Sequence, residues 1–485
     1  MIFNSVSFAG FFLVVFFLYY SPLKGNTKAQ NWLLLLSSYF FYGFADWKMV
    51  PLLLVATTII YFLGKALSKS NSDKNSSILT YLGVLTGVGL LVYFKYFNFF
   101  IDSFSSLFNA IGLHSNIGSF NIIMPLGISF FTFKLISYVV EIHRGKIEYC
   151  KDFVSFSTYI AFFPTILSGP IDKPNTFIPQ LQQRRTFDFA LAVDGCKQIL
   201  WGLFQKVVIA DNLAAVINDV WGDLPGQSSS TLFLTAILFS IQLYTDFSGY
   251  SHMAIGVGKI LGIQITKNFN YPFFSRSIDE FWRNWHISLT SWLTEYIFMP
   301  LNIKFRNLGK LGIILAIIAN MVVVGVWHGP NWTFALFGLY NGLLFIPLII
   351  SDSFFEKKKL KPNKYGLPTL KDLSKMIGTF LLITLGLILF RADDIGQAMG
   401  YISDIFSNSL FTIPEFEEKF KAVRTVVFIV FFFAIEWKGR LGIYAIDEIV
   451  KKWNNPIRWS FYSLLILAIG MFMASDESPF IYFQF

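Results

Sequence analysis

Apolar stretches recur along the whole chain and are separated by short polar segments. A bilayer core about 30 Å thick is crossed by roughly 20 apolar helical residues, or by fewer where polar flanking residues reach the interface. The stretches that fit a membrane span are residues 6–20, 32–44, 49–63, 78–101, 120–140, 193–216, 232–261, 311–327, 333–350, 376–390, 426–437 and 459–474. The pattern therefore predicts an all-α protein, a polytopic bundle of about a dozen transmembrane helices.

Two further apolar stretches fit neither a span nor a solvated loop. Residues 153–170 are broken by Pro164, Gly169 and Pro170, and residues 281–300 carry Arg, His and Glu among tryptophans. Irregular or polar backbone is tolerated at membrane depth only where protein or a water-filled cavity covers it. We expect both stretches to be re-entrant or interfacial helices around a funnel.

The connecting segments alternate in charge. Basic side chains gather in every second connection, namely Lys24, Lys28, Lys65, Lys69, Lys74, Arg144, Lys146, Lys151, Arg184, Arg185, Lys357, Lys358, Lys359, Lys361, Lys438, Arg440, Lys451 and Lys452. The connections between them, residues 102–118, 220–230 and 393–421 and the tail after residue 474, are neutral or acidic. Because basic loops stay in the cytoplasm, we expect a multi-pass protein of the inner or plasma membrane with both termini outside.

The composition excludes a soluble protein. Over 485 residues, 54% are hydrophobic and only 14% are charged, too few to cover a soluble surface. Apolar stretches from end to end favour a single membrane-embedded domain over residues 1–485, in which residues 351–375 form the clearest linker. The net charge of +9 lies in short loops, where it orients the protein, so we expect the lipid bilayer as partner and no nucleic acid.

Cysteine usage limits the possible cofactors. Cys150 and Cys196 are the two cysteines, and the sequence has no CxxC pair or Cys/His cluster of the kind that holds a metal. We expect both to be free thiols, and we expect no metal site and no tightly bound cofactor.

One histidine stands at the tip between two apolar stretches. His328 lies in residues 325–332 (GVWHGPNW), where Gly329 and Pro330 break the helix and expose backbone polar groups. An ionisable residue placed there is costly unless it is used or paired. The motif indicates either a catalytic histidine or an interfacial histidine that caps a helix end among tryptophans.

A second histidine lies among tryptophans in residues 281–290 (FWRNWHISLT). At helical spacing His286 shares a face with Trp282 and Leu289, while Arg283 and Asn284 point away. Desolvation favours the neutral imidazole, which is the form that can accept a proton. The alternative is a hydrogen-bonded histidine that only supports the re-entrant helix.

A third polar cluster interrupts a long apolar stretch at residues 244–252 (YTDFSGYSH). The carboxylate of Asp246 must pair at that depth, and we expect a histidine or arginine of the funnel as its partner. Polar contacts between helices would explain the cluster equally well, so we interpret Asp246 as supporting rather than catalytic.

Seven sequence blocks follow one another along the chain between about residues 124 and 342. In order, they are residues 124–133 (MPLGISFFTF), 162–170 (FFPTILSGP), 202–211 (GLFQKVVIAD), 246–251 (DFSGYS), 268–273 (NFNYPF), 282–289 (WRNWHISL) and 327–329 (WHG). Together these blocks resemble the membrane-bound O-acyltransferase (MBOAT) family, and most closely its branch of bacterial alginate O-acetyltransferase membrane subunits.

The resemblance implies a helical bundle around a funnel, through which an acyl group from a cytoplasmic thioester reaches a hydroxyl at the outer face. It places the essential histidine of the family at His328 and the second histidine at His286. The implied donor is acetyl coenzyme A or an acyl carrier, and the implied acceptor is a polysaccharide hydroxyl or a separate extracytoplasmic acetyltransferase. The implied function is O-acetylation of an exported or cell-surface polysaccharide.

Acyl transfer from a thioester to an alcohol needs a base, a donor for the developing oxyanion and exclusion of water. We expect His328 to be the base and His286 or Asn331 to stabilise the oxyanion, with or without an acyl-histidine intermediate. The residues expected to support them are Trp327, Asn331, Asp246, Trp285 and Arg283.

Three cations follow the second re-entrant stretch. Lys304, Arg306 and Lys310 suit the phosphates of coenzyme A or of a phosphopantetheine arm. They satisfy the positive-inside rule equally well, so the sequence leaves donor binding and orientation as two alternatives.

Two other functions fit parts of the pattern. A polysaccharide or lipid transporter or flippase would also have broken helices and buried polar residues, although no inverted repeat is visible. Transfer of a D-alanyl or lipid acyl group would use the same family motifs. The sequence names neither the polymer nor the acyl group.

Overall fold

The computed structural model describes residues 1–113, 118, 120–355, 363, 366–473 and 480–481. Within these ranges the regular elements are helices, and no described residue forms a strand. The described helices that are long and apolar enough to cross a membrane number seven: Thr27–Leu67, Asp73–Ala110, Phe189–Gly222, Ser229–Ile260, Lys310–His328, Trp332–Ile350 and Leu370–Arg391. The prediction of an all-α, polytopic membrane fold is confirmed.

The chain divides into two compact units. One comprises Met1–Ile199 and His252–Thr266, and the other comprises Leu200–Ser251 and Lys267–Phe485. Two of the crossings from one unit to the other fall inside helices, within α9 (Phe189–Leu203) and α11 (Ser229–Ile260). That both units belong to one membrane-embedded domain stays a prediction.

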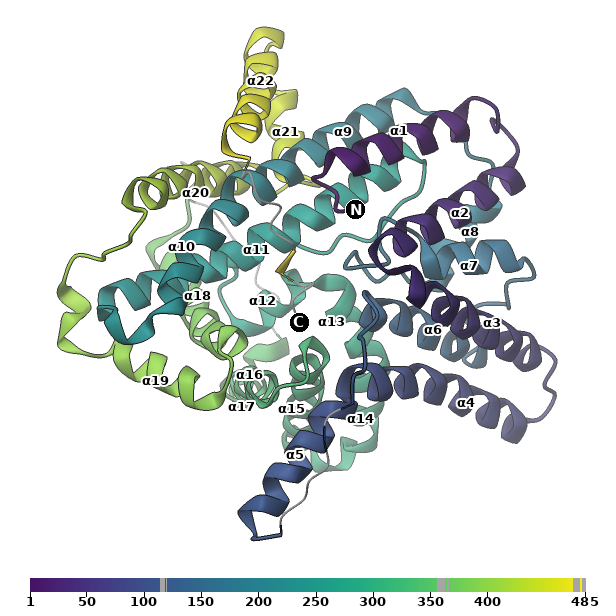
Figure 1. Cartoon of the computed structure of the whole chain (residues 1–485), viewed down its shortest axis with the longest axis horizontal. Helices are drawn as coiled ribbons and strands as arrows, with labels where there is room; N and C mark the ends of the chain where they lie inside the picture. The colour runs from purple at the N-terminus through teal and green to yellow at the C-terminus, as the bar shows by residue number, and fades with distance from the viewer. Residues whose placement is uncertain (114–117, 119, 356–362, 364–365, 474–479, 482–485) are drawn as a thin grey trace. The chain divides into compact units, whose positions relative to one another are not determined.

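The first unit contains the N-terminal helices. They are α1 (Val6–Tyr20), α2 (Thr27–Asp46), α3 (Val50–Leu67), α4 (Asp73–Leu91), α5 (Phe97–Ala110), α6 (Ile128–His143), α7 (Phe153–Ala161) and α8 (Pro174–Gln182). Helices α4 and α6 lie side by side (Figure 1), because Gly87 leaves space for the side chain of Ile136. A Cβ atom at Gly87 would lie 2.6 Å from Ile136 Cγ1, and such small residues allow membrane helices to approach closely.

The second unit holds the remaining helices and the histidines singled out above. They are α10 (Asp211–Gly222), α12 (Ile278–Asn284), α13 (Ile287–Leu293), α14 (Met299–Lys304), α15 (Lys310–His328), α16 (Trp332–Leu343), α17 (Ile346–Ile350), α18 (Leu370–Arg391), α19 (Ile395–Ile405), α20 (Lys419–Gly439), α21 (Ala445–Lys451) and α22 (Asn455–Phe472).

Helices α15 and α16 form a tightly packed hairpin whose backbones touch. A Cβ atom at Gly325 would lie 2.1 Å from the carbonyl oxygen of Phe334, and one at Gly338 would lie 2.3 Å from that of Met321. No other residue type fits at such separations without moving the backbone. The close crossing brings the first turns of α16 against the end of α15, where His328 stands.

The predicted spans need correction in places. The stretch at 120–140 becomes helical only at Ile128, because Pro125 cannot donate a backbone hydrogen bond and Gly127 adopts a left-handed φ of 71°. The stretch at 426–437 falls in α20, and residues 459–472 of the last predicted stretch fall in α22. Neither helix is among the seven long apolar helices. Helix α1 has 15 residues and is shorter than those seven.

The two stretches predicted as re-entrant are short and broken, as expected. Residues 153–170 form α7 and an irregular buried segment, and residues 281–300 run from the end of α12 through α13 into α14. Both cysteines are free thiols, Cys150 buried and Cys196 exposed, as predicted. Predictions for Lys357–Lys359, Lys361 and the C-terminal Phe485 concern positions outside the described residues.

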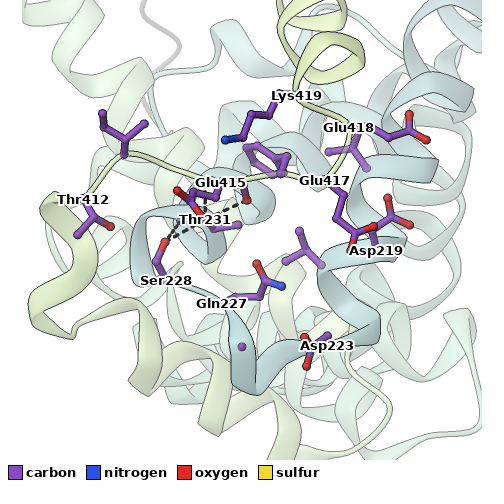
Figure 2. Close-up of a pocket in the computed structure, with 15 residues that line it drawn as sticks. Asp219, Asp223, Gln227, Ser228, Thr231, Thr412, Glu415, Glu417, Glu418 and Lys419 are labelled. Carbon is purple, nitrogen blue, oxygen red and sulfur yellow. Dashed lines mark hydrogen bonds between the residues drawn. The ribbon is translucent and has the colours of Figure 1, made fainter.

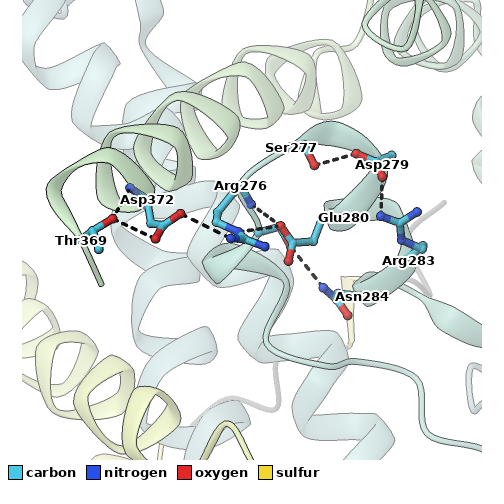
Figure 3. Close-up of polar contacts among 9 residues, drawn as sticks. Arg276, Ser277, Asp279, Glu280, Arg283, Asn284, Thr369 and Asp372 are labelled. Atoms are coloured by element: carbon cyan, nitrogen blue, oxygen red, sulfur yellow. Dashed lines mark hydrogen bonds and ion pairs between the residues drawn. The ribbon is translucent and has the colours of Figure 1, made fainter. Parts of the chain in front are cut away.

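Some connections predicted to share one face do meet in the second unit. The indole N–H of Trp437 donates to the carbonyl of Gly366 at 2.9 Å, and Arg276 pairs with Asp372 at 3.3 Å at the start of α18 (Figure 3). Figure 3 also shows Arg276 bound to Glu280 within the turn that leads into α12. The linker before α18 and the end of α20 therefore lie together, and their assignment to the cytoplasm stays a prediction.

Candidate functional site

His328 is the last residue of α15 and is 5% exposed. The chain then turns through Gly329 and Pro330, and Asn331 caps α16 by accepting the backbone N–H of Thr333 at 3.0 Å. A Cβ atom at Gly329 would lie 2.3 Å from the ring of Phe334, so this position needs glycine for close approach. The turn thus brings Phe334 over the end of α15.

Aromatic rings from three helices surround the imidazole of His328. Its ring centroid lies 4.9 Å from that of Phe390 on α18, 6.3 Å from Phe337 and 6.4 Å from Phe334 on α16, and 5.0 Å from the neighbouring Trp327. Such an enclosure excludes water, and an electrostatic interaction inside it is stronger than one in solvent.

His286 stands at a break between α12 and α13. Trp285 is extended and His286 adopts a left-handed backbone with φ 45° and ψ 52°. The prediction that Trp282, His286 and Leu289 share a face of one continuous helix is therefore wrong. Left-handed backbone costs a non-glycine residue about 1–3 kcal/mol, so surrounding contacts must hold this turn.

Asn268 supplies those contacts. Its side-chain Oδ1 faces Nδ1 of His286 at 3.1 Å and accepts from the backbone N–H and the hydroxyl of Ser288 at 3.2 and 2.9 Å. Its backbone carbonyl accepts from the N–H of Ile287 at 2.8 Å. Both Asn268 and His286 are 0% exposed, so the turn is fixed inside the protein.

His286 also packs against rings from two other helices. Its centroid lies 4.7 Å from Phe247 on α11 and 5.6 Å from Trp327 on α15, at steep angles in both cases. Burial lowers the pKa of His286 to about 3, because desolvation disfavours the imidazolium. The neutral imidazole predicted from the sequence agrees with this buried, aromatic environment.

Asp246 pairs with a lysine rather than with the histidine or arginine that we expected. Lys206, on the π-helical segment η3 (Phe204–Ala210), lies 2.6 Å from Asp246 and 2.7 Å from Asp211. The second oxygen of Asp246 accepts the backbone N–H of Ile481 at 2.8 Å. A lysine satisfies the buried carboxylate because its flexible stem reaches from η3 to α11. Since Phe247 follows Asp246, this ion pair fixes the part of α11 that touches His286.

The remaining supporting residues are placed as follows. Trp285 is buried among aromatic rings, with centroids 5.2 Å from Phe269 and 5.3 Å from Phe281. Arg283 is bound to Asp279 one turn earlier on α12, and Figure 3 shows this pair turned away from Arg276. Their roles in catalysis stay predictions.

The oxyanion roles proposed for Asn331 and His286 meet an obstacle in this structure. Asn331 donates its amide hydrogen to the carbonyl of Asp393 at 2.7 Å, and the Nδ1 side of His286 faces Asn268. In this arrangement both groups use polar atoms within the fold, which favours other roles for them.

A cavity of about 500 Å³ follows the face of α15 that carries His328. Val324 and Asn320 line it, one and two helical turns before His328, and residues four apart share a helix face. The other lining residues are Asp279, Trp282, Arg283, Thr290, Ser291, Thr294, Glu295, Phe298, Met299, Ile317, Met321, Phe345 and Phe354. The cavity is largely apolar with charged groups from α12 and η6 (Thr294–Phe298).

The three cations considered for donor phosphates do not line this cavity. Lys310 is bound to the carboxylate of Asp352 and to the carbonyl of Ile350, both at 2.9 Å. Lys304 and Arg306 lie on α14 and the short turn that follows it. Their role in donor binding stays a prediction.

A second cavity of about 650 Å³ lies between two connections predicted to face outward. Residues 219–231 form one wall and residues 412–419 the other. Figure 2 shows Thr231 hydrogen-bonded to Ser228 within its own wall and to Glu415 in the opposite wall. Its charged lining residues are Asp219, Asp223, Glu415, Glu417, Glu418 and Lys419. The connections at 219–231 and 412–419 thus lie on one face of this unit, as the alternation of charge predicts, and the assignment of that face to the outside stays a prediction.

The sequence interpretation missed several residues around the histidines. Phe390 lies in an apolar stretch with nothing to distinguish it from lipid-facing phenylalanines. Lys206 gave a usable signal, because a lysine in a long apolar helix must pair. Asn268 was part of a motif, but its contact with His286 depends on tertiary structure.

Comparison with known proteins shows the family of the chain. The family described as "MBOAT, membrane-bound O-acyltransferase family" matches residues 5–385. The chain is 30% identical to the probable alginate O-acetylase AlgI of Pseudomonas putida over 506 aligned residues, covering 100% of both chains. It is 28% identical to the peptidoglycan O-acetyltransferase of Helicobacter pylori, covering 100% of this chain and 98% of that one. It is 34% identical to the teichoic acid D-alanyltransferase of Bacillus subtilis, covering 50% of this chain and 62% of the relative.

Proposed function

Because the chain belongs to the membrane-bound O-acyltransferase family and is an acyltransferase, we propose that it moves an acetyl group from a cytoplasmic thioester to a polysaccharide outside the membrane. The acceptor is a hydroxyl of the polymer itself or of a separate extracytoplasmic acetyltransferase. Two relatives that match over the whole chain are named for O-acetyl transfer to alginate and peptidoglycan, which supports both the acetyl group and a polymeric acceptor.

The observation that carries the proposal is the position of His328. It ends an apolar helix, is 5% exposed and is enclosed by the rings of Phe334, Phe337 and Phe390. A histidine kept from water in this way suits a reaction in which hydrolysis of the thioester must not compete.

In the proposed reaction the acceptor oxygen bonds to the thioester carbonyl carbon and the carbon–sulfur bond breaks. His328 accepts the proton of the hydroxyl as the bond forms and returns it to the thiolate that leaves. Protons therefore balance without a further reactant. A positioned general base contributes typically 10²- to 10⁴-fold to such a step.

The cavity along α15 supports a route for the donor. It is about 500 Å³ in volume, a size typical of small-ligand sites, and its lining includes Asn320 and Val324, two helical turns and one helical turn before His328. We propose that the thioester arm of coenzyme A or of a carrier enters here, with Lys304, Arg306 and Lys310 near its phosphates.

Replacing Lys304, Arg306 and Lys310 by Gln tests the donor site. The variant should insert normally and need a higher donor concentration, with the maximal rate less affected, as for lost ground-state binding. If the variant needs the same donor concentration as the wild type, these cations do not bind the donor and serve only to orient the protein in the membrane.

Transfer of a D-alanyl group is the second candidate, supported by the similarity to teichoic acid D-alanyltransferase over half of the chain. The transporter alternative loses its support, because the family and the named relatives are acyltransferases.

The deciding measurement is the O-acetyl content of the cell's polysaccharides in a deletion strain, complemented with the wild type or with His328→Ala. We expect O-acetylation to disappear on deletion and to return only with the wild type. Unchanged O-acetyl content after deletion would refute acetyl transfer, and loss of D-alanyl esters instead would favour the second candidate.

A further inference from the structure

The hydrogen bonds around Asn268 determine which nitrogen of His286 carries its proton. A backbone N–H can only donate, and that of Ser288 lies 3.2 Å from the side chain of Asn268. The atom it meets must therefore be the carbonyl oxygen of the amide. The same oxygen lies 3.1 Å from Nδ1 of His286, and it can only accept.

Nδ1 of His286 is consequently the protonated nitrogen. A neutral imidazole has one N–H and one lone-pair nitrogen, and burial keeps His286 neutral, with its pKa lowered to about 3. Nε2 then carries the lone pair. In this tautomer His286 can accept a hydrogen bond through Nε2 but cannot donate one to an oxyanion.

We propose that Asn268 is a positioning residue for acyl transfer, which fixes the Nδ1–H tautomer and the direction of His286 so that Nε2 accepts a hydrogen bond from the thiol that forms as the donor leaves. The inference rests on the proposed acyltransferase function. It assigns His286 a different role from the oxyanion contact considered from sequence, and Asn268 a role beyond folding the turn.

Two aromatic side chains, Phe247 from α11 and Trp327 from α15, contact His286 from other elements and are uncharged. His328 touches the same indole of Trp327. Asn268, on the adjoining segment, supplies the carbonyl oxygen that faces Nδ1 and thereby selects the tautomer.

Substitutions at Asn268 and at its other partners separate tautomer control from a purely structural role. Asn268→Leu removes the acceptor for Nδ1–H at similar size. Ser288→Ala removes one bond to the same oxygen, and Ser251→Ala removes the hydroxyl that faces the Asn268 amide at 3.3 Å. Asn268→Asp keeps an acceptor but adds a charge that favours the imidazolium.

Turnover with acetyl coenzyme A is the kinetic readout. Asn268→Leu should lower kcat by roughly 10²-fold or more while the donor KM changes little, and both serine variants should stay within about threefold of wild type. Asn268→Asp should recover activity at alkaline pH and lose it toward neutral pH, where Nε2 of the variant becomes protonated. Equal losses in Asn268→Leu and Ser288→Ala would reduce Asn268 to a structural residue.

Nitrogen-15 NMR of the histidine-labelled full chain in nanodiscs gives a readout that needs no reaction. The His286 signals, identified by their loss in His286→Asn, should show a lone-pair nitrogen at Nε2 and an N–H at Nδ1 in the wild type. The opposite tautomer would overturn the inference even if Asn268→Leu fails to fold. A folded wild type that shows the expected tautomer but transfers no acetyl group would instead count against the proposed function.

Discussion

The imidazole of His286 and the indole of Trp327 lie edge to face, with ring centroids 5.6 Å apart and planes inclined by 73°. Trp327 also touches His328, at 5.0 Å. One indole therefore joins the histidine of the turn between α12 and α13 to the histidine at the end of α15. Two residues 42 positions apart in the sequence numbering thus become parts of one site.

Replacing His328 by Ala should abolish acetyl transfer while the protein still inserts and accumulates. The physical reason is loss of the base, which contributes about 10²- to 10⁴-fold. O-acetyl content of the polymer at equal protein level is the measurement, and His143→Ala, at an exposed histidine of α6, is the matched control. If His328→Ala retains near-normal O-acetylation, His328 is not the base, and its role is to cap the end of α15.

Replacing Phe390 by Ala should widen the range of acyl groups. Its ring lies 4.9 Å from that of His328, so its removal opens space beside the proposed base at a cost of about 3–5 kcal/mol in stability. Competition between acetyl and butyryl coenzyme A measures the preference. Phe411→Ala, at a side chain that is 93% exposed, should leave the preference unchanged, and an unchanged preference in Phe390→Ala would place the acyl group elsewhere.

Lys206, Asp211 and Asp246 form a buried charged cluster. Removing one of its charges should lower the free energy of unfolding far more than removing all three. Lys206 is 2% exposed, so Lys206→Met leaves two carboxylates buried and should cost about 3–5 kcal/mol. Replacing Asp211 and Asp246 by Leu in the same variant should recover much of this loss.

Chemical unfolding in detergent measures both variants of the cluster. The comparison is Lys310→Met, which breaks a solvated ion pair whose side chains are 48% and 68% exposed and should change stability by less than about 1 kcal/mol. If Lys206→Met also lowers the stability by less than about 1 kcal/mol, water reaches the charges of the cluster.

Acid should destabilise the protein through His286. Its folded pKa of about 3 lies below the usual value near 6.5, so between these values the unfolded chain binds a proton that the folded chain does not. Stability is then lost as pH falls below about 6.5, by roughly 1.4 kcal/mol per pH unit.

Thermal unfolding at several pH values tests this linkage. His286→Asn removes the titrating group and keeps a residue that tolerates left-handed backbone. Between about pH 6.5 and pH 5, this variant should therefore lose roughly 2 kcal/mol less folding stability than the wild type. His143→Asn should follow the wild type. If the wild type and His286→Asn lose the same stability as the pH falls, His286 is hydrated in the folded protein.

The predicted direction of acyl flow depends on the orientation of the protein. In a background with Cys150→Ser and Cys196→Ser, a membrane-impermeant thiol reagent applied from outside should modify a cysteine at position 417 and spare one at position 358. From the positive-inside rule we expect the basic linker that contains Lys358 to lie in the cytoplasm. The reverse labelling pattern would invert the topology and the proposed direction.

The sequence by itself determined the class of fold and the two histidines of interest. Apolar length alone requires helices in a bilayer, because backbone polar groups must be satisfied within each segment. The break at Gly329 and Pro330 likewise follows from local chemistry, and so does the enclosure of a histidine between apolar stretches. These features depend on residues close together in the chain.

Tertiary structure alone decided which groups meet. Helical spacing predicted a continuous helix through His286, but the bonds from Asn268, 18 residues away, hold a left-handed turn there. Asp246 pairs with Lys206 and accepts a hydrogen bond from the backbone of Ile481, a residue 235 positions further along the chain. A local pattern shows that a buried charge or strained turn needs a partner, but the partner is chosen by how distant helices pack, since that packing determines which polar atoms come within hydrogen-bonding distance.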